Sequence, residues 1–549
     1  MGGLFEGEEM KPARKRIYLK RRAAALIISM IFVLVFSALA VSMATLCGTN
    51  VQLAANQHKI NSALLAAQSG LECGKFIVAN TPLPSTTINV VTTTQANEAW
   101  STLCDQVQAQ PWVAGQATQT ENQITTPATS FGAANASFQI KFHRTDTHTV
   151  KLEGIGADGQ VVRHVSVDTK ITKDNEVLNY AIASRGRMWL TGDTTIHGDV
   201  FSSWDRAEIS PYNMNGDSAI IGTINTVLGL EQIQDETYQL ETLNEDDCPI
   251  DLNGDPLETN YEQRYYHPDD EIQAYHEGIN YGQPNQDMPG MDISDYDTDM
   301  YRDIVMNEGN GSIPASSTIE VEYFPHAAGD YTMPRDGTPR YTSNRKLDRH
   351  VYENETYTDV HLPDDRNALF KNCTFEGILY IDCYQSGSTK YNNVRFENCT
   401  FNGVIVSDVP QVFKWQHNCL YFTGEATFDN QSDIQESTIL APHFNVNLGN
   451  TNPQQSDNNV LTGAIVGGIV DVRGNAQIYG TIISMCDTTQ WSSGYVTNIG
   501  ATLDDGGSET TELGDIGVIG ITPDEDQMLP SGITSPIVIQ PLQDTYSEG

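Results

Sequence analysis

Positively charged residues are scarce in this sequence. Only 31 Lys and Arg stand against 71 Asp and Glu among 549 residues, which gives a formal net charge of −40. A protein that binds nucleic acid needs a basic face to release counterions from the phosphates. The composition therefore excludes nucleic acid as a partner.

Signatures of common enzymes and of zinc sites are also missing. The sequence contains no C-x-x-C pair, no G-x-S-x-G turn and no P-loop. Its twelve His residues are scattered, without the spacing of metal ligands. We therefore expect a protein that is not an enzyme, and its length predicts two to four domains.

Charge is absent from Ala23 to Gln57. The first part of this stretch, residues 23–46, is almost wholly apolar, and about 20 such residues cross a bilayer. A cleavable signal sequence has a shorter apolar region, of roughly 7–15 residues, and a buried core helix would not explain the seven bases among residues 1–22. Because bases stay on the cytoplasmic side, we predict a single-pass membrane helix. Its N-terminus is then cytoplasmic, and the bulk of the chain is extracytoplasmic.

The helical pattern continues past the apolar run. Apolar residues recur among polar ones from Val51 to Phe76, and no Pro occurs between Pro12 and Pro82. This spacing predicts one helix that extends several turns beyond the membrane.

Together these two stretches resemble the N-terminal region of PilX-like minor pilins. The resemblance covers roughly residues 21–76, from "RRAAALIISMIFVLVFSALAV" to "AAQSGLECG" (residues 66–74). It implies a minor subunit of a type IV pilus-like or type II secretion-like filament, which packs on other pilin-like subunits through this helix. Helical pilins generally carry Gly before the cleavage point and Glu five residues later, whereas this chain has Ala at 23–25 and no acid until Glu72. The resemblance therefore implies a tip, adhesion or accessory role rather than a shaft role.

Strand signals follow the helix. Residues 136–172 alternate apolar and polar side chains, with a turn signal at Ala157-Asp158-Gly159. We predict a small antiparallel sheet that packs on the exported part of the helix and completes a pilin-like domain over residues 47–178.

An internal repeat marks the second half of the chain. The stretches "FKNCTFEGILYI" (370–381) and "FENCTFNGVIVS" (396–407) lie 26 residues apart, and residues 418–424 form a looser third copy. A second shared element, G-[ND]-[AT]-x-I-x-G, occurs at 192–198 and 474–480. Such periods predict a right-handed parallel β-helix, with Asn at left-handed corners and Cys and Phe pointing inward. A β-sandwich or a propeller fragment is the alternative.

The predicted fold class is therefore α+β, with several segments. A cytoplasmic basic segment (1–22) precedes the transmembrane helix (23–46) and the pilin-like domain (47–178). A first β-helix coil (179–204) and the main β-helix (366–500) flank an acidic, Tyr-rich insertion (205–365). An extended C-terminal cap (501–549) contains four of the Pro residues.

One stretch has the oxygen-ligand spacing of a calcium loop. Asp251, Asn253, Asp255 and Glu262 occupy positions 1, 3, 5 and 12. Position 6 is Pro256, which cannot make the sharp turn that Gly makes there. An acidic surface turn and a low-affinity calcium site are both open interpretations, and no other cofactor is expected.

The nine Cys residues allow disulfides on an oxidising, exported side. Cys73 with Cys104 is one candidate pair. Cys373 with Cys399 is another, because the repeat would stack them on neighbouring coils, where an inward-facing row of thiols is the alternative.

These features predict a non-enzymatic, membrane-anchored surface protein. Its expected partners are the membrane, other pilin-like subunits and an extracellular ligand such as a surface polysaccharide. The alternative function is a membrane-anchored β-helix that binds or cleaves polysaccharide, for which convergent carboxylates with a base on one face would be the mark.

Overall fold

The computed structural model describes most of the chain. The described residues are 15–130, 135–190, 194–205, 211–214, 218–229, 239–240, 264–265, 275–284, 288–322, 331–332, 340–341, 347–364, 366–383, 392–413, 418–424, 426–428, 437–449, 459–473, 476–485, 496–499, 519–524 and 527–549. They form two compact units. One, the helix–sheet unit, contains residues up to 81, 100–170 and 539–549, and the other, the strand-stack unit, contains residues 82–99 and 171–538.

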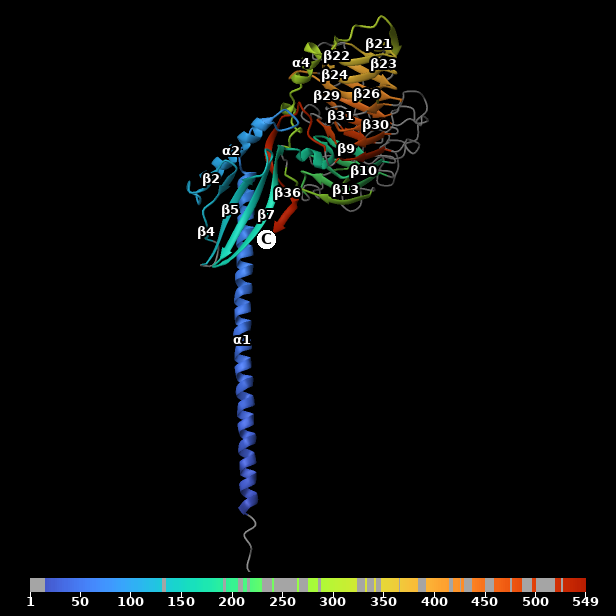
Figure 1. Ribbon diagram of the computed structural model, residues 1–549. Coiled ribbons are helices and arrows are strands. Elements are labelled where there is room, and N and C mark those ends of the chain that lie inside the picture. The colour runs from blue at the N-terminus through green and yellow to red at the C-terminus, as the bar shows by residue number, and fades with distance from the viewer. Residues whose placement is uncertain are drawn as a thin grey trace, which may run out of the picture. The chain divides into compact units, whose positions relative to one another are not determined.

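A single long helix, α1 (Lys15–Ala79), dominates the helix–sheet unit. It runs without a break for 65 residues, which confirms the continuous helix predicted from the absence of Pro. Its N-terminal part extends alone, whereas its C-terminal part packs on the sheet strands β5 and β6 (Figure 1).

The small sheet is antiparallel over the predicted residues. Strands β5 (Ala136–Arg144), β6 (Thr149–Asp158) and β7 (Val161–Lys173) pair in sequence order. Gly159 has φ +64° in the turn between β6 and β7, as the turn signal predicts. The sheet order is β1-β36-β7-β6-β5-β3-β2, with β4 on β5. The other elements of this sheet and the helix after α1 are β1 (Ser85–Thr86), α2 (Thr93–Ala109), β2 (Thr118–Thr120), β3 (Gln123–Thr125), β4 (Thr129–Ser130) and β36 (Ser535–Glu548).

Two glycines of β6 let α1 approach the sheet backbone to backbone. A Cβ at Gly154 would lie 2.1 Å from the carbonyl oxygen of Ala67, and one at Gly156 would lie 2.0 Å from that of Ala63. The facing residues of the helix are small as well, because Ala63, Ala66 and Ala67 are fully buried. Contact at this distance requires both partners to lack bulk.

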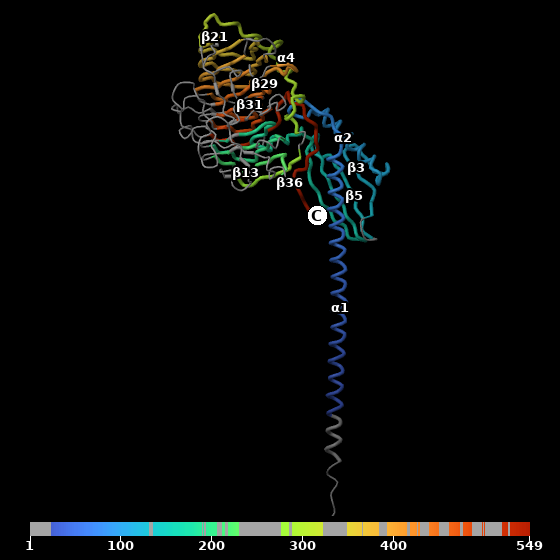
Figure 2. Tube along the Cα trace, turned by 180° about the vertical axis from the view of Figure 1, so that it is seen from behind, coloured from blue at the N-terminus to red at the C-terminus, as the bar shows by residue number. Residues whose placement is uncertain are grey.

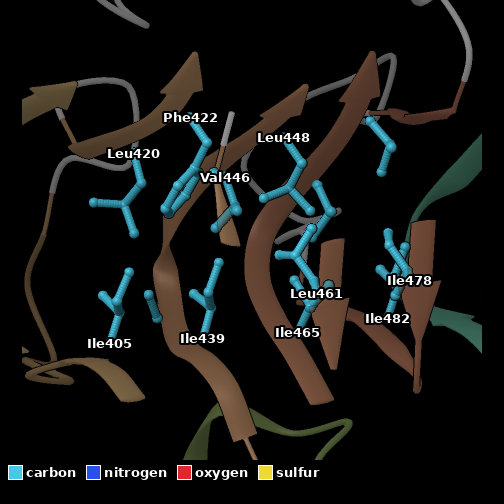
Figure 3. Packing of buried hydrophobic residues seen from close by; sticks show 14 of the residues in the cluster. Ile405, Leu420, Phe422, Ile439, Val446, Leu448, Leu461, Ile465, Ile478 and Ile482 are labelled. Atoms are coloured by element: carbon cyan, nitrogen blue, oxygen red, sulfur yellow. The ribbon is translucent and has the colours of Figure 1, made fainter. Parts of the chain in front are cut away.

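Mostly parallel strands form the strand-stack unit, and in the described residues they belong to a 24-stranded sheet, in which β18 pairs antiparallel with β21. From β21 to β31, neighbouring strands in the stack are successive turns of the chain (Figures 1 and 2). Figure 3 shows the core between them, where Ile405, Ile439, Ile465 and Ile482 lie in one row. The stack strands are β8 (Tyr180–Ser184), β9 (Arg187–Leu190), β10 (Thr194–His197), β11 (Asp199–Ser202), β12 (Tyr212–Met214), β13 (Ala219–Thr226), β16 (Tyr275–Asn280), β17 (Gly311–Ser312), β18 (Ile319–Glu322), β21 (Leu347–Glu353), β22 (Thr356–Leu362), β23 (Ala368–Lys371), β24 (Thr374–Ile381), β25 (Asn392–Glu397), β26 (Thr400–Ser407), β27 (Asn418–Thr423), β28 (Thr427–Phe428), β29 (Ser437–Gly449), β30 (Asn459–Thr462), β31 (Ala464–Arg473), β32 (Ala476–Tyr479), β33 (Ile482–Ser484), β34 (Val496–Ile499) and β35 (Ile519–Thr522).

The order of strands in the stack is not their order in the chain. One column of aligned aliphatic residues passes through Val360, Leu379, Ile405, Ile439, Ile465, Ile482, Ile182, Val200, Ile224 and Ile279. Ile482 on β33 is thus aligned with Ile182 on β8. The first strands of the stack therefore lie inside it, covered by the last coils of the chain.

The internal repeat aligns as predicted for its first two copies. Thr374 pairs with Thr400 and Phe375 with Phe401, 26 residues apart, and the Cys and Phe of each copy are buried. Their rings extend into two stacks, one of Tyr352, Phe370, Phe396 and Phe422 and one of Tyr357, Phe375, Phe401 and Phe428.

The alignment of the third copy was wrong. Phe422 pairs with Phe396, so Asn418 aligns with Asn392 and not with Asn398. The reason lies at the corner, where Gly424 follows Thr423 as Asn398 follows Glu397. Gly424 has φ +67° and takes the left-handed position that Asn fills in the other copies.

Asn at left-handed corners is confirmed. Asn354, Asn372 and Asn398 have φ values of 56°, 51° and 54°. Each donates its backbone N–H to a carbonyl on the next turn, Asn372 to Glu397 and Asn398 to Thr423. Asn tolerates this conformation better than other residues with a Cβ, which explains why it recurs at the corners.

The stack includes residues that the sequence assigned to other segments. Strands β12, β13, β16, β17, β18, β21 and β22 fall within 205–365, the expected insertion, and β35 falls within 501–549, the expected cap. Strand β36 of the antiparallel sheet also falls within 501–549. The expected insertion, 205–365, also contains α4 (Asp299–Asn307) and the 3₁₀ turn Ile293–Asp295. A second 3₁₀ turn spans Glu176–Asn179. Two short antiparallel pairs join β14 (Gln239–Leu240) to β15 (Arg264–Tyr265) and β19 (Tyr331–Thr332) to β20 (Arg340–Tyr341). Much of the acidic stretch lies outside the described residues.

Because α1 lies so close to β6, adding one methyl group at a glycine of β6 should strongly destabilise the helix–sheet unit. Gly156→Ala should lower the free energy of unfolding of the helix–sheet unit by about 2–3 kcal/mol, because its Cβ meets helix backbone that cannot move aside. Thermal unfolding of the full chain in detergent measures this. Gly48→Ala, where a Cβ meets nothing within 4 Å, is the control, and an equal effect of both substitutions would contradict the interpretation.

The corner of the repeat predicts a difference between two substitutions. Asn398→Val should destabilise the strand stack by about 1–2 kcal/mol, since a β-branched residue resists a left-handed backbone. Asn398→Gly should cost at most about 1 kcal/mol. Denaturant unfolding of the two variants checks the order, and a less stable Gly variant would show that the corner depends on the amide side chain instead.

Candidate functional site

The apolar segment of α1, residues 24–53, is the strongest candidate site. Every one of these residues is exposed, and large apolar side chains such as Val33, Leu34 and Phe36 are 64–67% exposed. By length and composition, the helix is long and apolar enough to cross a membrane. An isolated apolar surface of this length is stable only in lipid or against other helices. The segment is a candidate membrane anchor.

Three hydroxyl groups inside the apolar segment bond to the helix itself. The hydroxyl of Ser29 donates to the carbonyl of Leu26 at 2.8 Å. The hydroxyls of Thr45 and Thr49 donate to Val41 and Thr45, each at 2.9 Å. A group bonded to its own helix needs no partner from the bilayer. These residues therefore do not interrupt the membrane-compatible surface.

The length of the uncharged stretch matches a bilayer. At about 1.5 Å per residue, residues 24–46 extend roughly 35 Å, and a hydrocarbon core is about 30 Å thick. The first basic side chain after this stretch is Lys59, after which the helix begins to be buried by its own unit at Ile60. One face of α1 thus changes from lipid-like exposure to contact with β5 and β6 within a few turns.

Apolar side chains also remain exposed on the part of α1 that packs on the sheet. Leu65 is 57% exposed and Phe76 is 66% exposed. Lys75 pairs with Glu72 at 2.9 Å on the same helix. This part of α1 therefore keeps an exposed apolar surface on the side away from the sheet contact.

The predicted cysteine pairs occur as thiols. Cys73 is exposed and Cys104 is buried, and burial raises the pKa of the Cys104 thiol to about 12. Cys373 and Cys399 are both buried, and each Sγ lies 3.5 Å from a backbone carbonyl oxygen, that of Tyr352 and that of Phe370 respectively. Both disulfide assignments stay predictions.

The predicted calcium ligands Asp251, Asn253, Asp255 and Glu262 lie outside the described residues. Within the described part of the chain, no group of three or more His, Cys, Asp or Glu side chains is placed to hold a metal ion. The calcium site stays a prediction.

Sequence reasoning missed a Ser–His–Asp cluster at one end of the stack. Ser312 Oγ lies 2.7 Å from Nδ1 of His361, and His361 Nε2 lies 2.8 Å from Oδ2 of Asp382. The three residues come from β17, from β22 and from just after β24, so no sequence motif announces them. The Nε2–H direction does not point at the carboxylate, since this nitrogen forms no aligned hydrogen bond. The aligned Ser312–His361 bond joins β17 to β22, which pair at this position, and we assign the cluster to holding β17 on the stack.

Comparisons with known proteins give a distant likeness to solved structures. No protein-family model matches the chain, and no curated protein matches it. Among solved structures, the competence-associated pilin ComZ from Thermus thermophilus is 14% identical, over 89% of this chain and 98% of that chain, with a TM-score of 0.28. A TM-score this low does not establish a shared fold.

A charge placed in the apolar segment tests whether lipid covers it. Leu34→Arg should reduce the recovery of the chain with membranes about a hundredfold at equilibrium, because Arg at the centre of a span costs about 3 kcal/mol. Flotation of lipid vesicles with the purified chain measures binding. Leu34→Phe is the matched control, because it changes the same exposed side chain and keeps it apolar. Equal flotation of both variants would show that this segment is not inserted.

Proposed function

We propose that this chain is a non-enzymatic, membrane-anchored subunit of a type IV pilus-like or type II secretion-like filament. In this proposal the apolar segment holds it in the bacterial inner membrane with the N-terminus in the cytoplasm. The same helix then packs on other pilin-like subunits. The observation that carries the proposal is the division of α1 into an uncharged, exposed half and a half that packs on an antiparallel sheet.

Charge distribution supports the orientation. Seven bases precede the apolar segment, and the chain after residue 22 has a net charge of −44, from 24 bases and 68 acids. Basic residues are retained on the cytoplasmic side of a membrane. An acidic remainder does not oppose export in the same way.

The absence of an acid from the apolar segment supports an accessory or tip position. A carboxylate there would pair with the terminal amine of a neighbouring subunit, as the resemblance to PilX-like proteins implies for shaft subunits. Residues 23–57 contain none. A subunit that lacks this pairing would join a filament through apolar contacts alone.

We further propose that the strand stack is a right-handed parallel β-helix that presents an extracellular surface for adhesion. Support comes from the parallel pairing of strands one turn apart and from the unbroken column of buried aliphatic residues. Parallel strands joined by crossovers are right-handed in nearly all proteins. A rigid stack of this kind is suited to contact a surface polysaccharide or another extracellular ligand.

The orientation can be tested by protease protection. In spheroplasts that carry the full chain, added protease should remove everything after the membrane segment and leave a short fragment that contains residues 15–46. Intact cytoplasmic marker proteins are the control for lysis. Complete protection of the chain until detergent is added would contradict the proposed topology.

The filament role can be tested by comparing two fractions. Intact mass and N-terminal sequence should be measured for the chain in membranes and in material sheared from the cell surface. A filament subunit should appear in the sheared fraction and should be lost from it when Leu34→Arg is introduced. A chain confined to membranes in every condition would make it a plain anchored surface protein.

A further inference from the structure

Cys373 and Cys399 occupy equivalent corners of neighbouring coils. Each follows a left-handed Asn, Asn372 or Asn398, and each precedes a strand that pairs in register, Thr374 with Thr400. The backbone N–H of Thr400 donates to the carbonyl of Cys373 at 3.0 Å. The two cysteines are therefore held one above the other by the backbone on both sides of them.

Their side chains point the same way, into the core. Both thiols are almost fully buried and belong to the same core cluster. Cys373 Sγ also lies 3.5 Å from the carbonyl oxygen of Tyr352, and Cys399 Sγ lies 3.5 Å from that of Phe370. Neighbouring strands of a sheet are about 4.8 Å apart, which is within the Cα separation that a disulfide spans.

We propose that Cys373 and Cys399 form a disulfide that joins two coils of the stack when the chain folds in an oxidising compartment. The oxidant is a disulfide donor, such as oxidised glutathione or a protein disulfide. The thiolate of one cysteine attacks a donor sulfur and releases one donor thiol. The second cysteine loses its proton, attacks the mixed disulfide and releases the other donor thiol. Two electrons and two protons thus leave the pair, and the donor disulfide becomes two thiols.

The environment distinguishes the two thiols. The Cys399 side chain lowers the pKa of the Cys373 thiol, whereas burial raises the pKa of the Cys399 thiol. Because both are buried in the finished stack, exchange with the donor occurs before the neighbouring coils close over them.

Cys383 and Cys419 are the other described cysteines of the strand stack. Cys419 aligns with Asn393 on one side and with Asn445 on the other. Cys383 is buried, and burial together with nearby carboxylates raises the pKa of its thiol. Cys383 is therefore a suitable matched control, since it is a buried thiol of the same stack.

The bridge would stabilise one end of the stack. It joins the coil of β23 and β24 to that of β25 and β26, close to the end formed by β17, β18, β21 and β22. End coils of a stacked repeat have a neighbour on one side only and open first. Closing a loop of about 26 residues should reduce opening at this end about a hundredfold.

The test uses the purified full chain, refolded with oxidised and reduced glutathione and then alkylated. Trypsin leaves Cys373 and Cys383 in one peptide (372–390) and Cys399 in another (396–414), so Cys383→Ser is the parent variant for mapping. The expected product is the two peptides joined, two hydrogen atoms lighter than their sum. Full alkylation of both cysteines in the refolded chain would overturn the proposal.

Function of the bridge is measured by proteolysis. The oxidised parent should be cut in the stack about a hundredfold more slowly than the Cys373→Ser/Cys399→Ser variant. Reduction with dithiothreitol during refolding should bring the parent to the rate of that variant. Equal rates for the oxidised parent and the double variant would show that no stabilising bridge forms. Wild type and Cys383→Ser should behave alike.

The same mapping on protein from cells separates this inference from the proposed location, on which its occurrence in the cell depends. If the bridge forms in the refolded chain but not in cells, the result contradicts the proposed exported orientation. It leaves the proposed disulfide between Cys373 and Cys399 intact. A bridge in both samples supports both.

Discussion

The structure of the helix–sheet unit depends on the close contact between α1 and β6. Because Gly154 and Gly156 lack side chains, the helix backbone at Ala63 and Ala67 lies directly on the sheet. A contact this short fixes the axial position of the helix, since a shift by one residue would bring a larger side chain against a glycine. The free half of α1 is then held at a set position, with its apolar segment continuing outward as one rigid rod. An anchor that must transmit its position to a folded domain needs such a connection.

A different constraint organises the strand stack, namely register along each column. Ring stacks through Phe370 and Phe375 and the aliphatic column through Ile405 allow no slip between coils, because a one-residue shift would turn every inward side chain outward. Glycines that leave no room for a Cβ enforce the same register. A Cβ at Gly403 would lie 1.8 Å from the carbonyl of Gly377, and one at Gly480 would lie 2.1 Å from that of Gly463. The columns of buried side chains and the close glycine contacts therefore specify the same register between coils.

Sequence patterns predicted those parts of the fold that depend on a single property of the residues, such as lack of charge, lack of Pro or Asn at a left-handed corner. The uncharged run, the absence of Pro and the repeated Asn corners each have a single interpretation, and the long helix, the antiparallel sheet and the pairing of 374 with 400 followed. The third repeat was misaligned because Gly424 replaces Asn at its corner, so that matching the letters Asn-Cys gave the wrong register. Strands β17, β21 and β22 carry no repeated letters, and the role of Gly154 and Gly156 depends on a helix about 90 residues earlier. The predicted calcium ligands fall outside the described residues, so sequence remains the basis for that site.

The alignment of Ile182 with Ile482 has a consequence for how the chain folds. Strands β8 and β10 cannot complete their pairing until β33 and β35, some 300 residues later, have formed. Contacts between residues so distant in sequence form late and slowly. The helix–sheet unit also uses residues near the C-terminus, since the backbone of Gly549 exchanges hydrogen bonds with His164 at 3.1 and 2.8 Å. Both units therefore close only after almost the whole chain is available. For a chain held by an N-terminal anchor, this delays the completed fold until the chain after the anchor has emerged, when a bridge between early-formed coils would be of most use.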